Sequence, residues 1–419
     1  MFISQQQQHM KQHKTKNIKT FQHTTIPSDW EVKRFKEIIT SAKLGGNYEN
    51  SENNIGIPVI KMGNLDRGKI NLEKVQYLPE NEKYDEDDIL QEGDLLFNTR
   101  NTLDLVGKVA IWQNELSFAV YNSNLLRMKF NTKFVSSNYF MNYVFNSHYL
   151  LNQLRGVATG TTSVAAIYGR DLNTIKFYLP PLPEQKAIAQ VLSTWDSAIQ
   201  KAEALLAQKE LRKKGLMQQL LTGKKRLKGF SGEWKKLGAG EVFKSNSIKG
   251  QTNEELLSAT QDKGMIPRSM LEGRVTMPTS GTEGFKLVEK GDFVISLRSF
   301  QGGLEYSYYR GLVSPAYTVL KPKKPVSDGF YKQYFKSYDF IGHLAVAVIG
   351  IRDGKQISYD DFCTVKIPYP SLEEQTAIAQ VLQTADKEIQ LLKAKIAQLR
   401  AQKKGLMQQL LTGKKRIKL

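Results

Sequence analysis

Lys213–Arg226, with the sequence KKGLMQQLLTGKKR, recurs unchanged as Lys403–Arg416, 190 residues further along the chain. The similarity extends backward at the same offset without a gap, so that 30 of the 45 positions from Glu184 to Lys228 are identical in the second copy. A period this long indicates two copies of one unit, each a globular part of roughly 140 to 155 residues followed by the repeated segment. The globular parts resemble each other far less, which suggests one scaffold that holds two divergent domains.

The repeated segments have the periodicity of long helices. Apolar residues recur in both copies at alternating steps of four and three, which is a heptad seam. Prolines precede both segments, and Gly223 and Gly413 stand where a helix would stop. We therefore expect two helices of about 38 residues, each about 57 Å long. Gly215 and Gly405 inside them should cost about 1 kcal/mol each relative to alanine, and a close backbone crossing or a local kink would explain their presence.

The connectivity sets the direction of these helices. The first must run from one globular part to the other, and a second helix that packs on the same seam most simply runs back. We expect an α+β protein in which two mixed α/β domains are separated by two long antiparallel coiled-coil helices, with pseudo-twofold symmetry. A lone heptad stripe usually reflects ordinary core packing, but two near-identical stripes favour mutual packing.

The two globular parts show the same order of elements. Each begins near a tryptophan, Trp30 or Trp234, and later reaches a Gly-Asp turn that leads into a strand. Two more strands, an aromatic-rich helix and a last strand follow in each part. The predicted segments are 93–97, 108–112, 125–130, 137–154 and 175–178 in the first part, and 291–295, 304–309, 317–320, 329–344 and 365–367 in the second.

The composition favours a polyanionic partner. The formal net charge is +19 and the sequence pI is about 9.6, so nucleic acid is the first candidate and a membrane surface the alternative. No signal-peptide pattern and no apolar run near 18 residues is present. The single Cys363 cannot form an internal disulfide, and this is compatible with a cytoplasmic location.

The sequence contains no recognisable catalytic motif. A phosphate-binding Gly-x-x-x-x-Gly-Lys-Ser/Thr run is absent, and Gly238-Ala239-Gly240 stops short of a dinucleotide fingerprint. The adjacent prolines Pro180 and Pro181 lie in an apolar context that does not match the Asn/Asp-Pro-Pro-Tyr/Phe signature of an amino-methyltransferase. Histidine and cysteine spacing predicts no metal site. We therefore predict a non-catalytic chain.

The arrangement of these motifs resembles a known family. Leu182-Pro183-Glu184-Gln185 leads into the first long helix, Leu372-Glu373-Glu374-Gln375 leads into the second, and both helices end in Leu-Leu-Thr-Gly-Lys-Lys-Arg. This layout resembles the specificity subunit of type I restriction-modification enzymes over about residues 27 to 419. The resemblance implies target recognition domains at 27–182 and 229–372, a central conserved helix at 183–228 and a C-terminal conserved helix at 373–419. Residues 1–26, which are rich in glutamine, are expected to form a disordered polar tail.

The resemblance also implies a function and partners. In that family each target recognition domain reads one half of a bipartite site in double-stranded DNA, and the helices set the spacer and dock two modification (methyltransferase) subunits. Restriction (motor-nuclease) subunits would join them. S-adenosylmethionine, ATP and magnesium are expected on these partners, with no cofactor in this chain and no membrane association.

Two loops in each domain are the predicted DNA-contacting segments. Base edges are read by arginine, asparagine, glutamine and smaller polar side chains on loops that reach into a groove. For any single residue a turn role or a surface ion pair, such as Arg100 with Asp94 or Asp104, is the competing explanation, so the groups carry the prediction. The nominated residues are Asn98, Thr99, Arg100, Asn101, Thr159, Thr161, Thr162, Ser163 and Arg170 in the first domain, and Arg298, Ser299, Gln301, Arg352, Asp353, Lys355 and Gln356 in the second.

Two other functions compete with this interpretation. A coiled-coil adaptor that joins proteins would bind DNA without sequence preference. A self-sufficient modification or restriction enzyme would need a nucleotide or methyl-donor site, and the sequence shows none.

Overall fold

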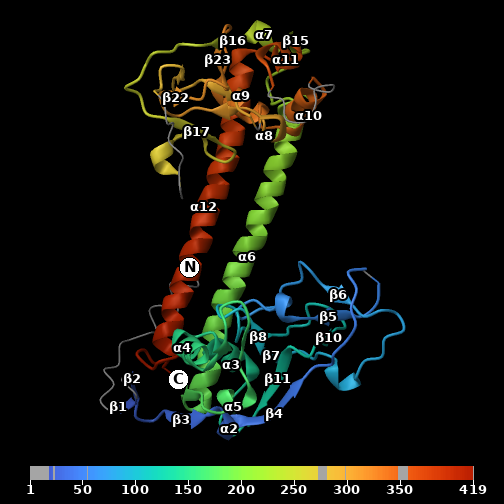
Figure 1. The fold of residues 1–419 in the computed structure, drawn as a ribbon, viewed down its shortest axis with the longest axis vertical. Coiled ribbons are helices and arrows are strands. Elements are labelled where there is room, and N and C mark those ends of the chain that lie inside the picture. Colours follow the sequence, from blue (N-terminus) through green and yellow to red (C-terminus); the bar gives the residue numbers. More distant parts are fainter. Residues whose placement is uncertain are drawn as a thin grey trace. The chain divides into compact units, whose positions relative to one another are not determined.

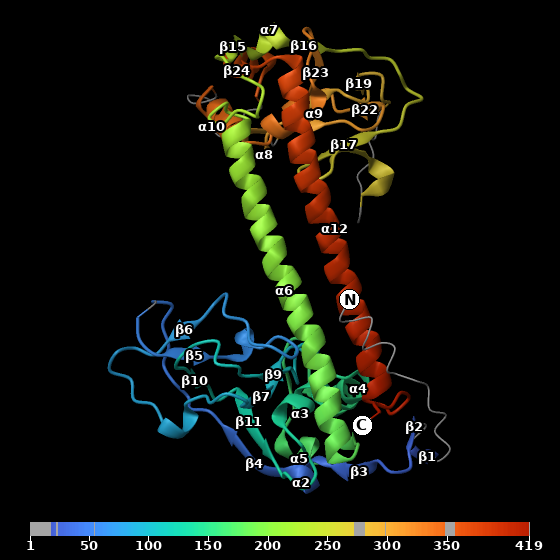
Figure 2. The ribbon, with the colours of Figure 1, turned by 180° about the vertical axis from the view of Figure 1, so that it is seen from behind.

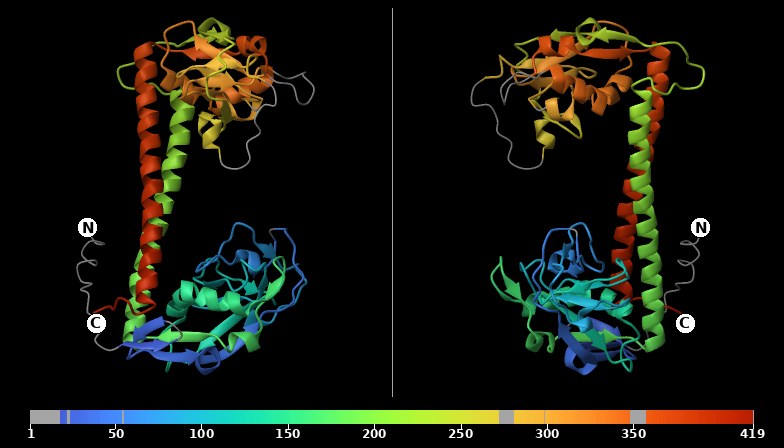
Figure 3. Two further views of the ribbon diagram at one scale, coloured as in Figure 1. Left: turned by 60° about the vertical axis from the view of Figure 1, so that its left-hand side comes forward. Right: turned by 90° about the vertical axis from the view of Figure 1, so that its right-hand side faces the viewer.

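The computed structural model describes residues 18–21, 24–53, 55–271, 281–297, 299–347 and 357–418. The chain divides into two compact units. Unit 1 comprises the chain up to Lys201 together with the segment from Ile396 onward, and unit 2 comprises Ala202–Lys395. Each unit therefore contains one globular domain and a segment of each long helix, and within each unit the domain lies to one side of the helix segments (Figure 3).

The two long helices are α6 (Leu182–Leu220) and α12 (Leu372–Leu410), each of 39 residues, as the heptad pattern predicts (Figure 1). Pro183 lies inside the first turn of α6 rather than before the helix. The N–H groups of a first turn make no intrahelical hydrogen bond, so the N–H that proline lacks is not needed there. Beyond the helix ends, Gly223 and Gly413 have φ values of 72° and 69°, the left-handed conformation that favours glycine. At Gly413 a Cβ would also lie 2.3 Å from Cδ of Pro27. The repeated Leu-Leu-Thr-Gly sequence thus ends both helices in the same way.

Within each unit the two helix segments run antiparallel. The start of one long helix packs against the end of the other, with the leucines and isoleucines of the seam between them. In unit 1, Ile188 and Leu192 of α6 share a core with Leu406 and Leu410 of α12. In unit 2 the seam consists of Leu216 and Leu220 of α6, and Ile378 and Leu382 of α12.

Gly215 and Gly405 do not mark a close backbone crossing. A Cβ built on either residue has nothing within 4 Å among the described residues, outside the helix's own turn. Both helices run through these positions without interruption. The structure therefore contradicts the crossing and leaves these glycines as intrahelical costs of about 1 kcal/mol each.

The first domain contains short strands and helices around a four-stranded antiparallel sheet in the order β4-β11-β7-β9. Figure 2 shows α3 between this sheet and α6. The elements are β1 (Ile18–Phe21), β2 (Thr24–Pro27), β3 (Glu31–Arg34), α2 (Phe35–Ile38), β4 (Ile39–Leu44), β5 (Pro58–Ile60), η1 (Met62–Asn64), β6 (Gln76–Tyr77), η2 (Glu86–Asp88), β7 (Leu95–Asn98), β8 (Arg100–Asn101), β9 (Val109–Ile111), β10 (Val120–Tyr121), β11 (Leu125–Phe130), α3 (Asn138–Phe145), α4 (His148–Val157), β12 (Thr159–Gly160), β13 (Ala165–Ala166), α5 (Gly169–Leu172) and β14 (Lys176–Leu179).

The second domain repeats this plan, with a four-stranded sheet in the order β16-β23-β20-β21. The last strand of each domain pairs with an early strand, β14 with β3 and β24 with β15. The elements are β15 (Lys235–Gly238), α7 (Ala239–Val242), β16 (Phe243–Asn246), β17 (Leu257–Thr260), β18 (Gly264–Pro267), η3 (Arg268–Met270), β19 (Lys286–Val288), β20 (Phe293–Ile295), α8 (Ser299–Gly302), β21 (Glu305–Tyr306), β22 (Gly311–Val313), β23 (Thr318–Pro322), α9 (Asp328–Tyr334), α10 (Tyr338–Ala347), α11 (Tyr359–Thr364) and β24 (Lys366–Tyr369).

The predicted aromatic-rich helix is two helices in each domain. In the first, Ser147 separates α3 from α4, and its Oγ donates to the carbonyl of Val144 at 2.6 Å. In the second, Ser337 separates α9 from α10 and donates in the same way to the carbonyl of Tyr334, also at 2.6 Å. A serine hydroxyl competes with the helical backbone for hydrogen bonds, which explains a break that the apolar pattern does not reveal.

Ordered structure begins before the predicted domain boundary. β1 pairs with β2, and Ile26 is fully buried with Trp30 and Tyr178. The prediction of a disordered tail is therefore corrected for residues 18–21 and 24–26, because the apolar side chain of Ile26 belongs to a small core. Residues 1–17 and 22–23 of the predicted tail lie outside the described residues.

Candidate nucleic-acid interface

The residues shared by the two repeats join each domain to its helices. In unit 1 the carboxylate of Glu184, 2% exposed, accepts hydrogen bonds from Trp30 Nε1 at 3.2 Å and from Nε and Nη2 of Arg416 at 2.6 and 2.7 Å. Arg416 also forms a bidentate pair with Asp29 at 2.9 and 2.8 Å. This fork-to-fork geometry fixes both position and angle, so it holds the start of the first domain against both long helices.

Unit 2 contains the same arrangement. Glu374, also 2% exposed, accepts from Trp234 Nε1 at 2.9 Å and from Nε and Nη2 of Arg226 at 2.5 and 2.6 Å. In each unit the glutamate comes from one repeat and the arginine from the other. Each of the two Glu–Arg pairs therefore forms only when both repeats pack together.

A second pair of repeated residues ties the domains to the helices. In unit 1 Asp196 accepts from Tyr143 Oη at 2.8 Å and pairs with Lys403. In unit 2 Asp386 pairs with Lys213 at 2.6 Å and accepts from Gln333 at 2.8 Å. Several polar contacts thus hold each domain on its helix segments. Such contacts keep the domain in a fixed orientation, and a binding surface needs a fixed orientation to fit its target.

The structure brings the two nominated loops of the first domain together. β13 pairs with β8 on one side and with β12 on the other, so Asn101 lies opposite Ala165 and Gly160 pairs with the same alanine. The backbone N–H of Leu103 also donates to the carbonyl of Thr162 at 3.1 Å. Segments that are about sixty residues apart in sequence therefore form one small surface, the hairpin sheet β12-β13-β8.

The side chains of this sheet differ in exposure. Asn98 is fully buried and its Oδ1 accepts from the backbone N–H of Arg100 at 3.1 Å, while Thr99, half-buried, donates to the carbonyl of Asn124 at 2.9 Å. These two residues shape the turn rather than face solvent. Asn101 is half-buried, and the exposed nominees are Arg100, Thr159, Thr161, Thr162, Ser163 and Arg170.

The proposed ion pairs of Arg100 do not form among the described residues. Asp94 is buried and pairs instead with Arg127 at 3.2 Å, and neither Asp94 nor Asp104 contacts the Arg100 side chain. Arg170 lies 3.6 Å from Asp171 and has an 80% exposed side chain. The cationic heads of both arginines are therefore accessible from solvent.

Exposed apolar side chains lie among these polar groups. Val164 is 68% exposed in the β12–β13 turn, and Leu103, Leu105 and Tyr168 are also exposed. Hydroxyls, guanidinium groups and apolar side chains on one surface match the mixture of acceptors, donors and thymine methyl groups in the DNA major groove. These apolar residues could not be predicted as surface residues, because the sequence alone does not distinguish an exposed valine from one in the core.

In the second domain most nominees fall outside the described residues: Arg298, Arg352, Asp353, Lys355 and Gln356. Ser299 is fully buried, and its Oγ accepts from the backbone N–H of Ser296 at 2.8 Å, which shapes the start of α8. Gln301 is exposed on α8. A Cβ on the neighbouring Gly302 would lie 3.0 Å from Nε2 of Gln261, so α8 adjoins the β17–β18 turn.

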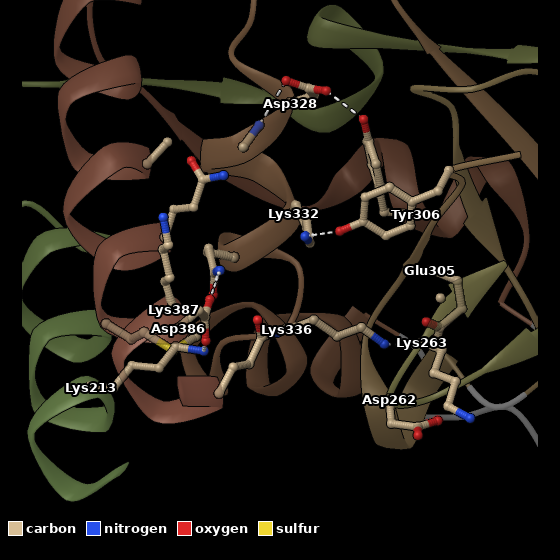
Figure 4. A pocket seen from close by; sticks show the side chains of 18 of the residues that line it. Lys213, Asp262, Lys263, Glu305, Tyr306, Asp328, Lys332, Lys336, Asp386 and Lys387 are labelled. Carbon is tan, nitrogen blue, oxygen red and sulfur yellow. Dashed lines mark hydrogen bonds and ion pairs between the residues drawn. The ribbon is translucent and has the colours of Figure 1, made fainter. Parts of the chain in front are cut away.

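That turn borders an open hollow of ≈ 1150 Å³ between the second domain and the helix segments of unit 2 (Figure 4). Its charged groups are mostly paired within the hollow: Lys336 contacts Glu305 at 2.7 Å, and Asp328 accepts from Tyr306 at 2.5 Å. Burial lowers the pKa of Lys332, whose ammonium group contacts Tyr308. Among the described residues that line it, this wide, polar hollow shows no arrangement of an acid, a base and a nucleophile. It lies where the second domain meets the segments of α6 and α12 in unit 2.

No group of three or more histidine, cysteine, aspartate or glutamate side chains is placed to hold a metal ion among the described residues. In the same part of the chain no helix is long and apolar enough to cross a membrane.

The comparisons with known proteins agree with this architecture. The family model described as the type I restriction modification DNA specificity domain matches the chain twice, at residues 27–208 and 231–401. The chain belongs to the type I restriction-modification DNA specificity family. Within it, the chain is 28% identical to a putative type I restriction enzyme MjaX specificity subunit from Methanocaldococcus jannaschii, over 97% of this chain and 98% of that protein.

Solved structures show the same fold at lower identity. A chain from a study of complex assembly and conformational transition in the type I restriction-modification system aligns with a TM-score of 0.57 at 19% identity, over 92% of this chain and 98% of that one. The specificity subunit HsdS from Thermoanaerobacter tengcongensis aligns with a TM-score of 0.50 at 19% identity, over 93% and 98% of the two chains. The chain therefore has two DNA specificity domains and serves DNA recognition.

Proposed function

We propose that this specificity subunit binds a bipartite, asymmetric site in duplex DNA, with each domain contacting one half-site. The observation that carries the proposal is the hairpin sheet β12-β13-β8, whose exposed side chains and those beside it include hydroxyls, guanidinium groups and apolar groups. The two domains share a plan but differ in sequence, so the two half-sites should differ. The net charge of +19 supplies the phosphate attraction on which the affinity depends.

The long helices are proposed to set the distance between the half-sites. Rigid joints at Glu184 and Glu374 support this role, because each fixes a domain on the helices through buried, charge-assisted hydrogen bonds. A spacing of about one turn of DNA, roughly 34–36 Å between half-site centres, or slightly more, suits two modules on one face of the duplex.

Two identical modification subunits are the proposed protein partners. The 14-residue run that is identical in both repeats includes exposed positions, among them Lys214 and Gln218 in the first copy and Lys404 and Gln408 in the second. Internal packing requires only the seam, so identity at these exposed positions needs a separate explanation; elsewhere in the helices some exposed positions are identical between the copies and others differ. The identity of these exposed residues in the two copies supports a single type of partner protein that binds once to each copy.

The remaining expectations follow from this assembly. Restriction subunits would join the modification subunits, and S-adenosylmethionine, ATP and magnesium would be bound by these partners in the cytoplasm. Calorimetry with the isolated chain should then show no binding of S-adenosylmethionine or ATP.

Selection of random duplex DNA, at two salt concentrations, with the chain and its modification subunit tests the function. Two short, unlike motifs at a fixed separation that persist at the higher salt are expected. Binding without an enriched motif, lost uniformly as salt rises, would contradict the proposal and favour a coiled-coil adaptor with non-specific DNA affinity.

A further inference from the structure

Val164 is an apolar side chain held in solvent at the turn between β12 and β13. It is 68% exposed, whereas Ala165 and Ile167 in the same segment are 1% and 2% exposed and belong to the main core of the first domain. These buried neighbours anchor the strand, so Val164 stays outside the core. Leu103, whose backbone N–H donates to the carbonyl of Thr162 at 3.1 Å, is exposed beside the turn. A single exposed apolar residue is ordinary, but several on one small surface indicate a binding site.

Hydrogen bonds close the turn that presents Val164. Its backbone N–H donates to Oγ1 of Thr161 at 3.2 Å, and its carbonyl accepts from the Thr161 N–H at 2.8 Å. Gly160 has a φ of 127°, and a Cβ there would lie 2.3 Å from the Val164 carbonyl oxygen, so glycine suits this position. Both backbone groups of Val164 are therefore in use, and its isopropyl group is the part left to contact a partner. A β-branched side chain has few rotamers, so ordering it on binding costs little.

The charges around the hairpin favour duplex DNA as the partner of Val164. Arg100 is exposed on β8, which pairs with β13, and Arg170 in α5, shortly after β13, has an 80% exposed side chain. Accessible arginines beside an apolar tip suit a duplex, because phosphates flank both sides of each groove. Within the grooves, the apolar group that projects from a base edge is the C5 methyl of thymine, and it lies in the major groove.

We propose that the isopropyl group of Val164 packs against the C5 methyl of one thymine in the major groove, and that this contact selects thymine at one position of the half-site bound by the first domain. The inference rests on the proposed function and names a specificity-determining residue within it. A cytosine at the same position offers no methyl group and leaves Val164 against a polar base edge. The contact involves no charge, so it adds selectivity without changing the salt dependence of binding.

The test removes methyl groups from either side of the contact. Full-length wild type and Val164→Ala, each with its modification subunit, are titrated with the duplex that wild type selects and with duplexes in which each thymine of both half-sites is replaced in turn by deoxyuridine. Deoxyuridine lacks the C5 methyl and keeps the base pairing of thymidine. Ile55→Ala is the matched control, because Ile55 is 71% exposed in the first domain and lies outside the hairpin sheet. Thermal unfolding checks that these surface substitutions leave the fold intact.

Wild type should bind about fourfold more weakly when one particular thymine loses its methyl. Val164→Ala should bind the unmodified duplex about fourfold more weakly, with an unchanged salt slope, and should show no further loss with deoxyuridine at that position. Ile55→Ala should behave like wild type.

Three results would count against the inference. Equal sensitivity to deoxyuridine in wild type and Val164→Ala, or no sensitivity of wild type at any thymine, would overturn the thymine contact alone. Weaker assembly of Val164→Ala with the modification subunit, at unchanged deoxyuridine sensitivity, would assign this surface to that protein instead. If wild type selects no bipartite motif, the proposed function itself fails.

Discussion

Glu374→Gln should destabilise unit 2 by about 2–3 kcal/mol. The substitution removes the charge that accepts from Nε and Nη2 of Arg226 at 2.5 and 2.6 Å, and one remaining oxygen can still accept from Trp234. Breaking a fully buried ion pair costs about 3–5 kcal/mol, and hydrogen bonds to charged groups contribute about 1.5–3 kcal/mol. Because the Arg226 side chain is 22% exposed, water recovers part of the loss.

The equivalent change in unit 1 should cost less. Arg416 keeps its bidentate contact with Asp29 at 2.9 and 2.8 Å when Glu184 is replaced, so Glu184→Gln is expected to cost about 1–2 kcal/mol. Glu373→Gln is the matched control for Glu374→Gln, since Glu373 is the preceding residue of α12 and is exposed; it should cost less stability than Glu374→Gln.

Urea unfolding measured by circular dichroism gives the total loss, and native-state hydrogen exchange assigns it to a unit. Protection should fall in the β16-β23-β20-β21 sheet for Glu374→Gln and in the β4-β11-β7-β9 sheet for Glu184→Gln. A larger loss for Glu184→Gln than for Glu374→Gln, or a loss of protection in the other unit, would refute the argument from local contacts.

Three further outcomes are expected. Gly215→Ala and Gly405→Ala should each raise stability by about 1 kcal/mol, measured by urea unfolding, since a Cβ has open space at both sites; a loss would mean that the helices need these glycines. Burial raises the pKa of Glu305, and Lys336 opposes this shift. The stability that protonated Glu305 contributes is therefore fully present below the ordinary glutamate pKa of about 4.3 and is lost as pH rises through the raised pKa. Relative to wild type, Glu305→Ala should gain stability from acid to neutral pH in parallel unfolding series, and a constant difference would argue against this linkage. Inserting one heptad into both α6 and α12 should lengthen the spacer found by DNA selection and keep both half-sites, whereas altered half-sites would contradict a spacer role for the helices.

The long-range organisation could be predicted because it repeats. The heptad seam and Gly223 and Gly413 gave the helices and their ends, and the shared order of strands gave the common domain plan. These signals are local or periodic, so a single chain displays them.

The individual contacts could not be predicted in the same way. Asn98 and Ser299 are polar residues of a type that reads DNA, yet both are buried in turns where they accept backbone N–H groups. Burial and tertiary proximity, rather than residue type, separate contact residues from turn residues.

The exchange of residues between the repeats has a consequence for synthesis. Glu184 and Arg416 are separated by 232 positions, and Asp29 and Arg416 by 387, whereas Arg226 and Glu374 of unit 2 are separated by 148. On the ribosome the domain that emerges first must wait for the segment from Ile396 onward, while unit 2 closes around a contiguous stretch. Long loops close slowly and leave apolar surface exposed meanwhile. The nascent first domain, with Ile188 and Leu192 still uncovered by α12, is therefore the stage at which this chain most needs protection from aggregation.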